Sequence, residues 1–316
     1  MNEQQSRMEA AYRLAAAIEQ QRSGTPLELA DDELVAVTGT YDRVEDVFRL
    51  AGLPHRVVAP DELDMSALRP DGFLAVNCAA SPLLPQAAAL RQWVAEGGTL
   101  LTTDWAVDLA AACFPGVIRR LPDVQTGDEV VPVEVLDTGS PVTSGLFLDD
   151  EAPRWWLESS SYPFEVTEGV QVLVQSSEME ARYGSALVAV AFHWYRGMAL
   201  HMISHFYLQR AELRTAKDAG GSIGFVKEAL GDFAAETMAA SPAMAAAIER
   251  TATGELKAAY TNYSIAAGML RAKKAGPGTA GEKMAPPRTD HPITAEADLA
   301  ATRSAGYAPG RWRKTA

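Results

Sequence analysis

Short apolar runs and amphipathic segments alternate along the first third of the chain. Residues 34–38 form a continuous apolar run, and residues 73–77 lack polar alternation, which is typical of a strand that is covered on both faces. Segments of helical periodicity separate them, and this spacing predicts parallel strands joined by right-handed crossovers. The expected strands are residues 34–38, 56–59, 73–77 and 99–102, and the expected helices are residues 43–50, a segment that opens at Pro85, and residues 105–113.

The central unit of this pattern runs from residue 72 to residue 105. A buried strand is followed by an amphipathic helix that ends at Gly97-Gly98, and a second buried strand ends on Thr103-Asp104-Trp105. In open α/β sheets, ligands bind at the carboxyl ends of the strands. We therefore expect Asp104 to lie at the edge of the sheet where a functional site would be found.

The second half of the chain predicts further strands and a hairpin. Residues 130–135, 154–157 and 170–175 have strand patterns. Two apolar runs, residues 187–193 and 198–204, are separated by a short turn, which predicts a β-hairpin whose second strand leads to His205.

Helical extensions are expected at both ends of the chain. The pattern of residues 3–21 predicts an amphipathic helix, which we expect to pack on the flank of the domain. A helix that binds a partner is the alternative. Its apolar stripe consists of Met8, Ala11, Tyr12, Ala15 and Ile18. The expected organisation is an N-terminal helix at 1–24, an α/β domain at 33–232, an Ala-rich helical extension at 241–274 and a disordered tail at 275–316.

Charge and cysteine content narrow the classes of partner. The net charge of −13 argues against nucleic-acid binding, and no apolar run approaches the ~20 residues of a membrane span. The polar N-terminus does not resemble a signal peptide. Only Cys78 and Cys113 occur, both in apolar surroundings, so no disulfide framework is expected and a reducing compartment fits. We expect a cytoplasmic protein without cofactor, nucleic acid or membrane partner.

Three stretches resemble, in their order along the chain, segments of the class I glutamine amidotransferase-like proteins, including their ThuA-like relatives. They are FLAVNCAASPLLPQAAALRQWVAEGGTLLTTDW at 73–105, SPVTSGL at 140–146 and YRGMALH at 195–201. The resemblance covers about residues 33–207. It implies a flavodoxin-like α/β fold: a mostly parallel, doubly wound sheet with an antiparallel edge hairpin, here with helical N- and C-terminal extensions.

The resemblance also shows where this chain departs from active relatives. Those proteins carry a glycine-flanked cysteine elbow after the fourth strand, where this chain has Thr103-Asp104-Trp105, with no cysteine and no glycines to allow a strained turn. Their oxyanion loop is glycine-rich, whereas Asn77 and Cys78 are followed here by two alanines. His205 stands at the place of the family's histidine. The resemblance therefore implies a pseudoenzyme that has kept the fold.

The candidate residues lie at the expected carboxyl ends of the strands. Cys78, His205 and Asp104 are the candidates for a covalent mechanism, which is the alternative to a non-catalytic site. We interpret the Gly39-Thr40 turn as an ordinary βα connection, with Asp42 capping the next helix. An anion site at the start of that helix is the alternative. The candidates for ligand binding are Gly39, Thr40, Asn77, Cys78, Asp104, Trp105 and His205.

No metal is expected from the sequence. His201 and His205 are four residues apart and would lie ~13 Å apart along a strand, which is too far for shared coordination. A mixed site that combines them with His193 and Asp104 is the alternative, and separate structural histidines are favoured.

The leading functional hypothesis is a non-catalytic amidotransferase-like domain used for binding or assembly. Its ligand would be a protein partner or a small molecule at the carboxyl edge of the sheet, with protein partners or homo-oligomers formed through the terminal helices. One alternative is a hydrolase or transferase that uses Asp104, His205 and Cys78. Another is ThuA-like binding of a sugar or small molecule without a covalent step.

Overall fold

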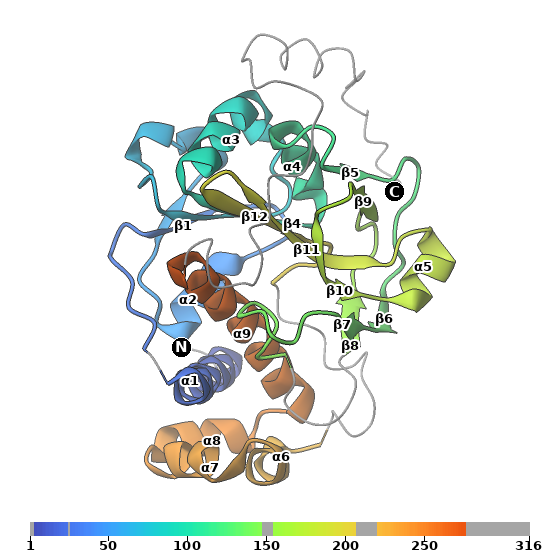
Figure 1. Ribbon diagram of the computed structural model, residues 1–316. Coiled ribbons are helices and arrows are strands. Elements are labelled where there is room, and N and C mark those ends of the chain that lie inside the picture. The colour runs from blue at the N-terminus through green and yellow to red at the C-terminus, as the bar shows by residue number, and fades with distance from the viewer. Residues whose placement is uncertain (1–2, 25, 147–153, 207–219, 276–316) are drawn as a thin grey trace, which may run out of the picture.

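The computed structural model describes residues 3–24, 26–146, 154–206 and 220–275, and its centre is an eight-stranded sheet (Figure 1). Five neighbouring strands are parallel, and the remaining three are antiparallel and lie at one side. In spatial order the strands are β2 (Arg56–Val58), β1 (Leu34–Val37), β3 (Phe73–Val76), β4 (Thr99–Thr103), β12 (Gly197–Met202), β11 (Leu187–Trp194), β10 (Gln171–Gln175) and β7 (Glu134–Val135). This arrangement confirms the predicted α/β class with antiparallel strands at one side.

The predicted hairpin consists of β11 and β12, and its second strand enters the parallel part of the sheet. β12 pairs in parallel with β4, with His201 opposite Thr102 and Met202 opposite Thr103. Gly197 permits this entry, since a Cβ there would lie 2.1 Å from the carbonyl oxygen of Val94. The carboxyl ends of β3, β4 and β12 therefore lie next to one another.

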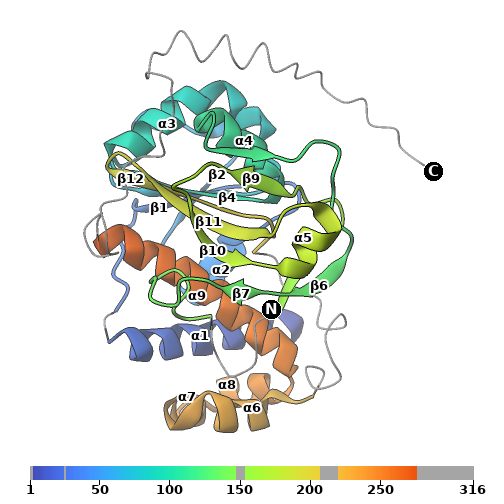
Figure 2. The ribbon, with the colours of Figure 1, turned by 45° about the vertical axis from the view of Figure 1, so that its right-hand side comes forward.

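Helices cover both faces of the sheet (Figures 1 and 2). The helices α3 (Ala87–Glu96) and α4 (Val107–Cys113) lie on one face, and α1 (Glu3–Ser23), α2 (Val44–Ala51) and α9 (Thr253–Ala275) lie on the other. Beyond α1 lie α6 (Ser222–Ala229), α7 (Gly231–Ala239) and α8 (Pro242–Glu249), while α5 (Ser177–Tyr183) follows β10. Two small sheets pair β5 (Ile118–Arg120) with β9 (Phe164–Val166) and β6 (Glu129–Pro132) with β8 (Arg154–Leu157).

Helices from opposite ends of the chain, α1 and α9, lie against each other. The side-chain amide of Asn262 donates to the buried hydroxyl of Tyr12 at 3.2 Å, and Arg271 forms an ion pair with Glu19 at 3.1 Å. All five residues of the predicted α1 stripe are buried, which confirms that this helix packs on the domain. α9 is buried around most of its circumference, which explains why no single apolar stripe was visible in its sequence.

Several element boundaries differ from the sequence-based expectation by a residue or two, and the single strand expected at 130–135 was wrong, because β6 and β7 belong to different sheets. The helix expected to open at Pro85 begins as a 3-10 segment, Ser81–Gln86, before α3. Of the tail predicted to be disordered, all but Ala275 lies outside the described residues. Within the described part of the chain, no helix combines the length and the apolar composition that a membrane crossing requires.

Candidate functional site

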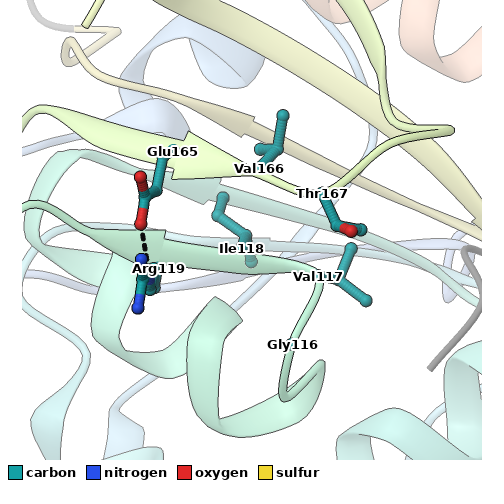
Figure 3. A pocket seen from close by; sticks show the side chains of 7 residues that line it. All are labelled: Gly116, Val117, Ile118, Arg119, Glu165, Val166 and Thr167. Atoms are coloured by element: carbon teal, nitrogen blue, oxygen red, sulfur yellow. Dashed lines mark hydrogen bonds and ion pairs between the residues drawn. The ribbon is translucent and has the colours of Figure 1, made fainter. Parts of the chain in front are cut away.

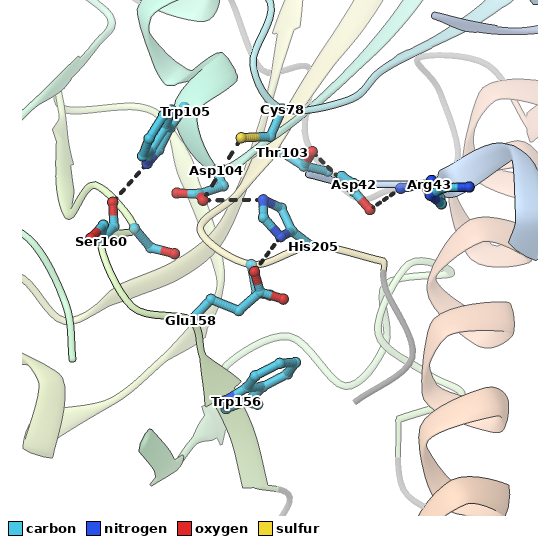
Figure 4. Close-up of polar contacts among 12 residues, drawn as sticks. Asp42, Arg43, Cys78, Thr103, Asp104, Trp105, Trp156, Glu158, Ser160 and His205 are labelled. Atoms are coloured by element: carbon cyan, nitrogen blue, oxygen red, sulfur yellow. Dashed lines mark hydrogen bonds and ion pairs between the residues drawn. The ribbon is translucent and has the colours of Figure 1, made fainter. Parts of the chain in front are cut away.

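The ends of β3, β4 and β12 bring together Cys78, Asp104 and His205, the predicted candidates for chemistry (Figure 4). One donor atom from each residue lies within 4.8 Å of the other two. All three residues are buried, with exposed fractions of 0, 3 and 5%. The topology thus places residues that are far apart in the sequence in one compact cluster at the carboxyl edge of the sheet.

Asp104 occupies a strained turn between β4 and the 3-10 segment Asp104–Ala106. Its φ of +42° lies in the left-handed region, which aspartate tolerates better than most residues other than glycine. A left-handed turn therefore forms at this position without the glycines that were expected to be required. The carboxylate accepts a hydrogen bond from the backbone N–H of Tyr162 at 3.2 Å.

His205 lies between two carboxylates. Its Nε2 is 3.1 Å from Asp104 Oδ2, and its Nδ1 is 2.5 Å from Glu158 Oε2. The ring N–H directions do not meet normal hydrogen-bond geometry with either oxygen, so these contacts are ion pairs. Burial opposes the charged imidazolium, but the contacts with Asp104, Cys78 and Glu158 outweigh it and raise the pKa of His205. Burial also raises the pKa of Asp104, and His205 partly offsets that rise.

The Cys78 thiol is held as a neutral group. Its Sγ donates toward Asp104 Oδ2 at 3.9 Å. Burial raises the pKa of Cys78, Asp104 adds to the rise, and His205 only partly offsets it. Because the thiolate is the nucleophilic form of cysteine, this environment opposes covalent chemistry at Cys78.

Asp42 does not cap α2, so that prediction was wrong. Its carboxylate instead accepts from Thr103 Oγ1 and from the backbone N–H of Arg43, each at 2.7 Å. Asn77 takes over part of the capping, since its Oδ1 accepts from the backbone N–H of Val44 at 3.1 Å. Burial raises the pKa of Asp42 to about 6. The fold brings Thr103 to Asp42, and this long-range bond replaces the local cap.

Gly39 and Thr40 support the turn that carries Cys78. The backbone N–H of Thr40 donates to the Cys78 carbonyl oxygen at 2.8 Å. A Cβ at Gly39 would lie 2.0 Å from that same oxygen, so only glycine permits the close approach. These contacts give both residues a positional role beside the cluster.

A loop after β8 supplies residues that the sequence analysis missed. The sequence of residues 159–161 indicates only a polar loop. In the structure, Glu158 forms an ion pair with His205, and the backbone carbonyl of Ser160 accepts a hydrogen bond from Trp105 Nε1 at 2.6 Å. No local motif marks Glu158, because its role depends on a contact 47 residues away along the chain. The only signal in the sequence was that Glu158 directly follows the aromatic strand predicted at residues 154–157.

An aromatic strip, defined as Tyr41, Trp105 and Tyr162, lies beside the cluster. The Trp105 and Tyr162 rings stack at 5.4 Å, and Tyr41 meets Trp105 edge-on at 5.4 Å. The guanidinium of Arg120 lies 4.7 Å from the Tyr162 ring centroid. Tyr41 is 53% exposed, so the strip extends from the buried cluster to the surface.

The other candidate histidines lie outside the cluster. His201 is buried on β12, with its Nδ1 2.9 Å from Thr102 Oγ1 and its ring edge-on to Phe164. Burial lowers the pKa of His201 to about 3. Among the described residues, the group with metal-ligand spacing consists of Cys78, Asp104 and His205, without His193 or His201.

A pocket of about 380 Å³ lies away from the cluster, beside β5 and β9 (Figure 3). An ion pair between Arg119 and Glu165 crosses the paired strands there. None of the predicted site residues lines this pocket. Its lining consists of Gly116, Val117, Ile118, Arg119, Glu165, Val166 and Thr167.

Solved structures of glutamine amidotransferases are among those similar to this chain. One from Thermotoga maritima is 12% identical, with 77% of this chain and 99% of that chain covered, at a TM-score of 0.44. One from Methylobacillus flagellatus is 13% identical, with 83% and 99% covered, also at 0.44.

Part of a larger enzyme is also similar, and this chain spans only 27% of its length. It is a β-galactosidase of glycoside hydrolase family 42, 12% identical over 54% of this chain, at a TM-score of 0.37. No family model and no curated protein matches this sequence. TM-scores below 0.5 carry no conclusion about activity. The α/β architecture is established by the strand order of the sheet itself.

Proposed function

We propose that this chain is an amidotransferase-like domain that binds a partner or small ligand at the carboxyl edge of its sheet and performs no amidotransfer. The observation that carries this proposal is the residue found at the position where active relatives have their cysteine elbow. Asp104 occupies it, and its carboxylate is engaged by His205 and by the backbone of Tyr162. A carboxylate held in this way is not available for attack on an amide.

The remaining thiol does not replace the missing nucleophile. Acyl transfer needs an activated thiolate or alkoxide, and burial keeps the Cys78 thiol protonated. His205 is clamped between Asp104 and Glu158, so its nitrogens serve ion pairs. The same three residues that would form a Cys–His–Asp mechanism therefore support a binding role better.

The aromatic strip supports binding at this edge. Tyr41 exposes half of its surface, and Trp105 and Tyr162 continue the aromatic face inward. Tyrosine and tryptophan are enriched in interfaces because one side chain combines a large apolar face with a polar group. The buried stripe of α1 leaves this strip as a better candidate contact surface than the terminal helices.

An ammonia-release assay with glutamine tests the absence of amidotransfer. We expect the full chain to release no more ammonia than its Cys78→Ala variant, because no activated thiolate is present. A glutaminase activity that the Cys78→Ala variant loses would refute the proposal and favour the covalent alternative.

Sedimentation equilibrium tests assembly through the aromatic strip. We expect the full chain to self-associate and Tyr41→Ala to weaken that association. Tyr195→Ala is the matched control, since Tyr195 is 54% exposed on the β11–β12 turn, outside the strip. Equal weakening by both substitutions would contradict the assignment of the surface.

A further inference from the structure

The Cys78–Asp104–His205 cluster has the dimensions of a metal site. For a tetrahedral zinc ion, normal bond lengths place sulfur and oxygen ligands ~3.5 Å apart and nitrogen and oxygen ligands ~3.3 Å apart. Here Cys78 Sγ and Asp104 Oδ2 are 3.9 Å apart, and His205 Nε2 and Asp104 Oδ2 are 3.1 Å apart. Movements of a few tenths of an ångström would bring these two pairs to coordination geometry.

Glu158 adds an outer partner to the histidine. A histidine that ligates a metal through one nitrogen usually donates its other N–H to a carboxylate, which fixes its tautomer and orientation. His205 has the spacing for this arrangement, since Nε2 faces the cluster and Nδ1 lies 2.5 Å from Glu158 Oε2 (Figure 4). The ring is thus oriented for coordination through Nε2.

The charges around His205 are compatible with a bound divalent cation. Asp104 and Glu158 pair with this one ring, and the buried carboxylate of Asp42 acts on it electrostatically. Buried carboxylates are costly unless opposite charge compensates them. A divalent ion would replace the protons of the Cys78 thiol and the His205 imidazolium, so its two charges balance the Cys78 thiolate and the Asp104 carboxylate without changing the net charge of the cluster.

Unmatched polar atoms provide an independent observation. His205 Nε2, the nitrogen that faces the cluster, lacks a hydrogen bond of normal geometry within the described residues. The Ser161 hydroxyl is fully buried, and it too lacks such a partner there. Buried polar atoms are rarely left in this state unless an ion or water completes them.

We propose that Cys78 Sγ, Asp104 Oδ2 and His205 Nε2 bind a divalent transition-metal ion, with zinc as the best match. Sulfur, imidazole nitrogen and carboxylate oxygen together are a donor set that zinc favours. On binding, the Cys78 thiol and the His205 imidazolium each release one proton to solvent, so that the sulfur coordinates as thiolate and the imidazole coordinates through Nε2 as its Nδ1–H tautomer. The fourth position is left for water or a ligand donor. This inference rests on the proposed function, because the thiol serves as a ligand instead of a nucleophile.

Cobalt is the probe for this site, because a thiolate–cobalt bond gives a charge-transfer band in the near ultraviolet. The full chain is first stripped with a chelator, which is then removed, and Co²⁺ is titrated. We expect saturation at one ion per chain, a charge-transfer band, and its disappearance when Zn²⁺ displaces the cobalt. Glu158→Gln is expected to weaken metal affinity about 10–100-fold while keeping the band at saturation, since Glu158 positions the ligand His205.

The two cysteines provide the matched comparison. Cys78→Ser should lose the band, whereas Cys113→Ser should keep it, because Cys113 is buried in α4 outside the cluster. Circular dichroism of each variant establishes that it is folded. Absence of the band in the wild-type chain, or its survival in folded Cys78→Ser, would overturn the metal site.

The outcomes for this site and for the proposed function are separable. A chain that binds cobalt through Cys78 and also hydrolyses glutamine would refute the non-catalytic role and support the metal site. A chain that shows neither cobalt binding nor glutaminase activity would refute the metal site and leave the proposed function in place.

Discussion

His201 offers a pH-dependent test of the sheet beside the candidate site. Burial lowers the pKa of this histidine to about 3, whereas an unfolded histidine titrates at about 6.5. As the pH falls, the unfolded chain therefore binds the proton before the folded chain does. The contribution of His201 to stability is fully present above pH 6.5 and is lost as the pH falls toward 3.

The size of the loss follows from these two pKa values. Between pH 8 and pH 5, His201 alone should lower the free energy of unfolding by about 2 kcal/mol. Asp42 acts in the opposite direction, because its pKa of about 6 in the folded chain exceeds its ordinary 3.8. Protonation of Asp42 in the folded chain thus adds stability as the pH falls below 6, and a comparison between variants is needed to isolate His201.

Denaturant unfolding of the wild-type chain, His201→Gln and His201→Phe at pH 8 and pH 5 measures the difference. We expect the wild type to lose about 2 kcal/mol more than either variant between these pH values. The two variants differ in packing, so their stabilities differ, but their pH dependence should agree. A wild-type pH dependence equal to that of both variants would refute the neutral, buried state of His201.

Two further pairs of substitutions test how the site is held. Gly39→Ala should cost about 1–3 kcal/mol in denaturant unfolding, because its Cβ would lie 2.0 Å from the Cys78 carbonyl oxygen; Gly224→Ala, with nothing within 4 Å, should cost nothing. Glu158→Gln should cost about 3 kcal/mol because it leaves its buried imidazole partner with one carboxylate fewer. Glu165→Gln removes an exposed ion pair and should cost under about 1 kcal/mol. Equal losses within either pair would contradict the packing described.

The fold could be predicted from the sequence where local patterns reflect burial. Continuous apolar runs correspond to β1, β3 and β4, which are buried along their whole lengths, and the apolar stripe of residues 3–21 corresponds to the buried face of α1. The pairing of β12 with β4 was not predicted, because register between distant strands leaves no local periodicity.

The site could be predicted only in part. Asp104, Cys78 and His205 were found because each follows a predicted strand, and parallel strands end at a common edge. Glu158 was missed because its contact with His205 depends on the path of a polar loop. Asp42 was misassigned because its cap pattern is local, whereas its actual partner, Thr103, lies 61 residues away.

Alkylation of the two cysteines in the native, metal-free chain tests the central claim most directly. Cys113 is an internal reference, because it is buried and its thiol pKa is raised to about 12. With iodoacetamide at neutral pH and detection by mass spectrometry, we predict that Cys78 reacts no more than about tenfold faster than Cys113, and that both react once the chain is unfolded. Rapid, selective alkylation of Cys78 in the native chain would show an activated nucleophile and contradict a non-catalytic site.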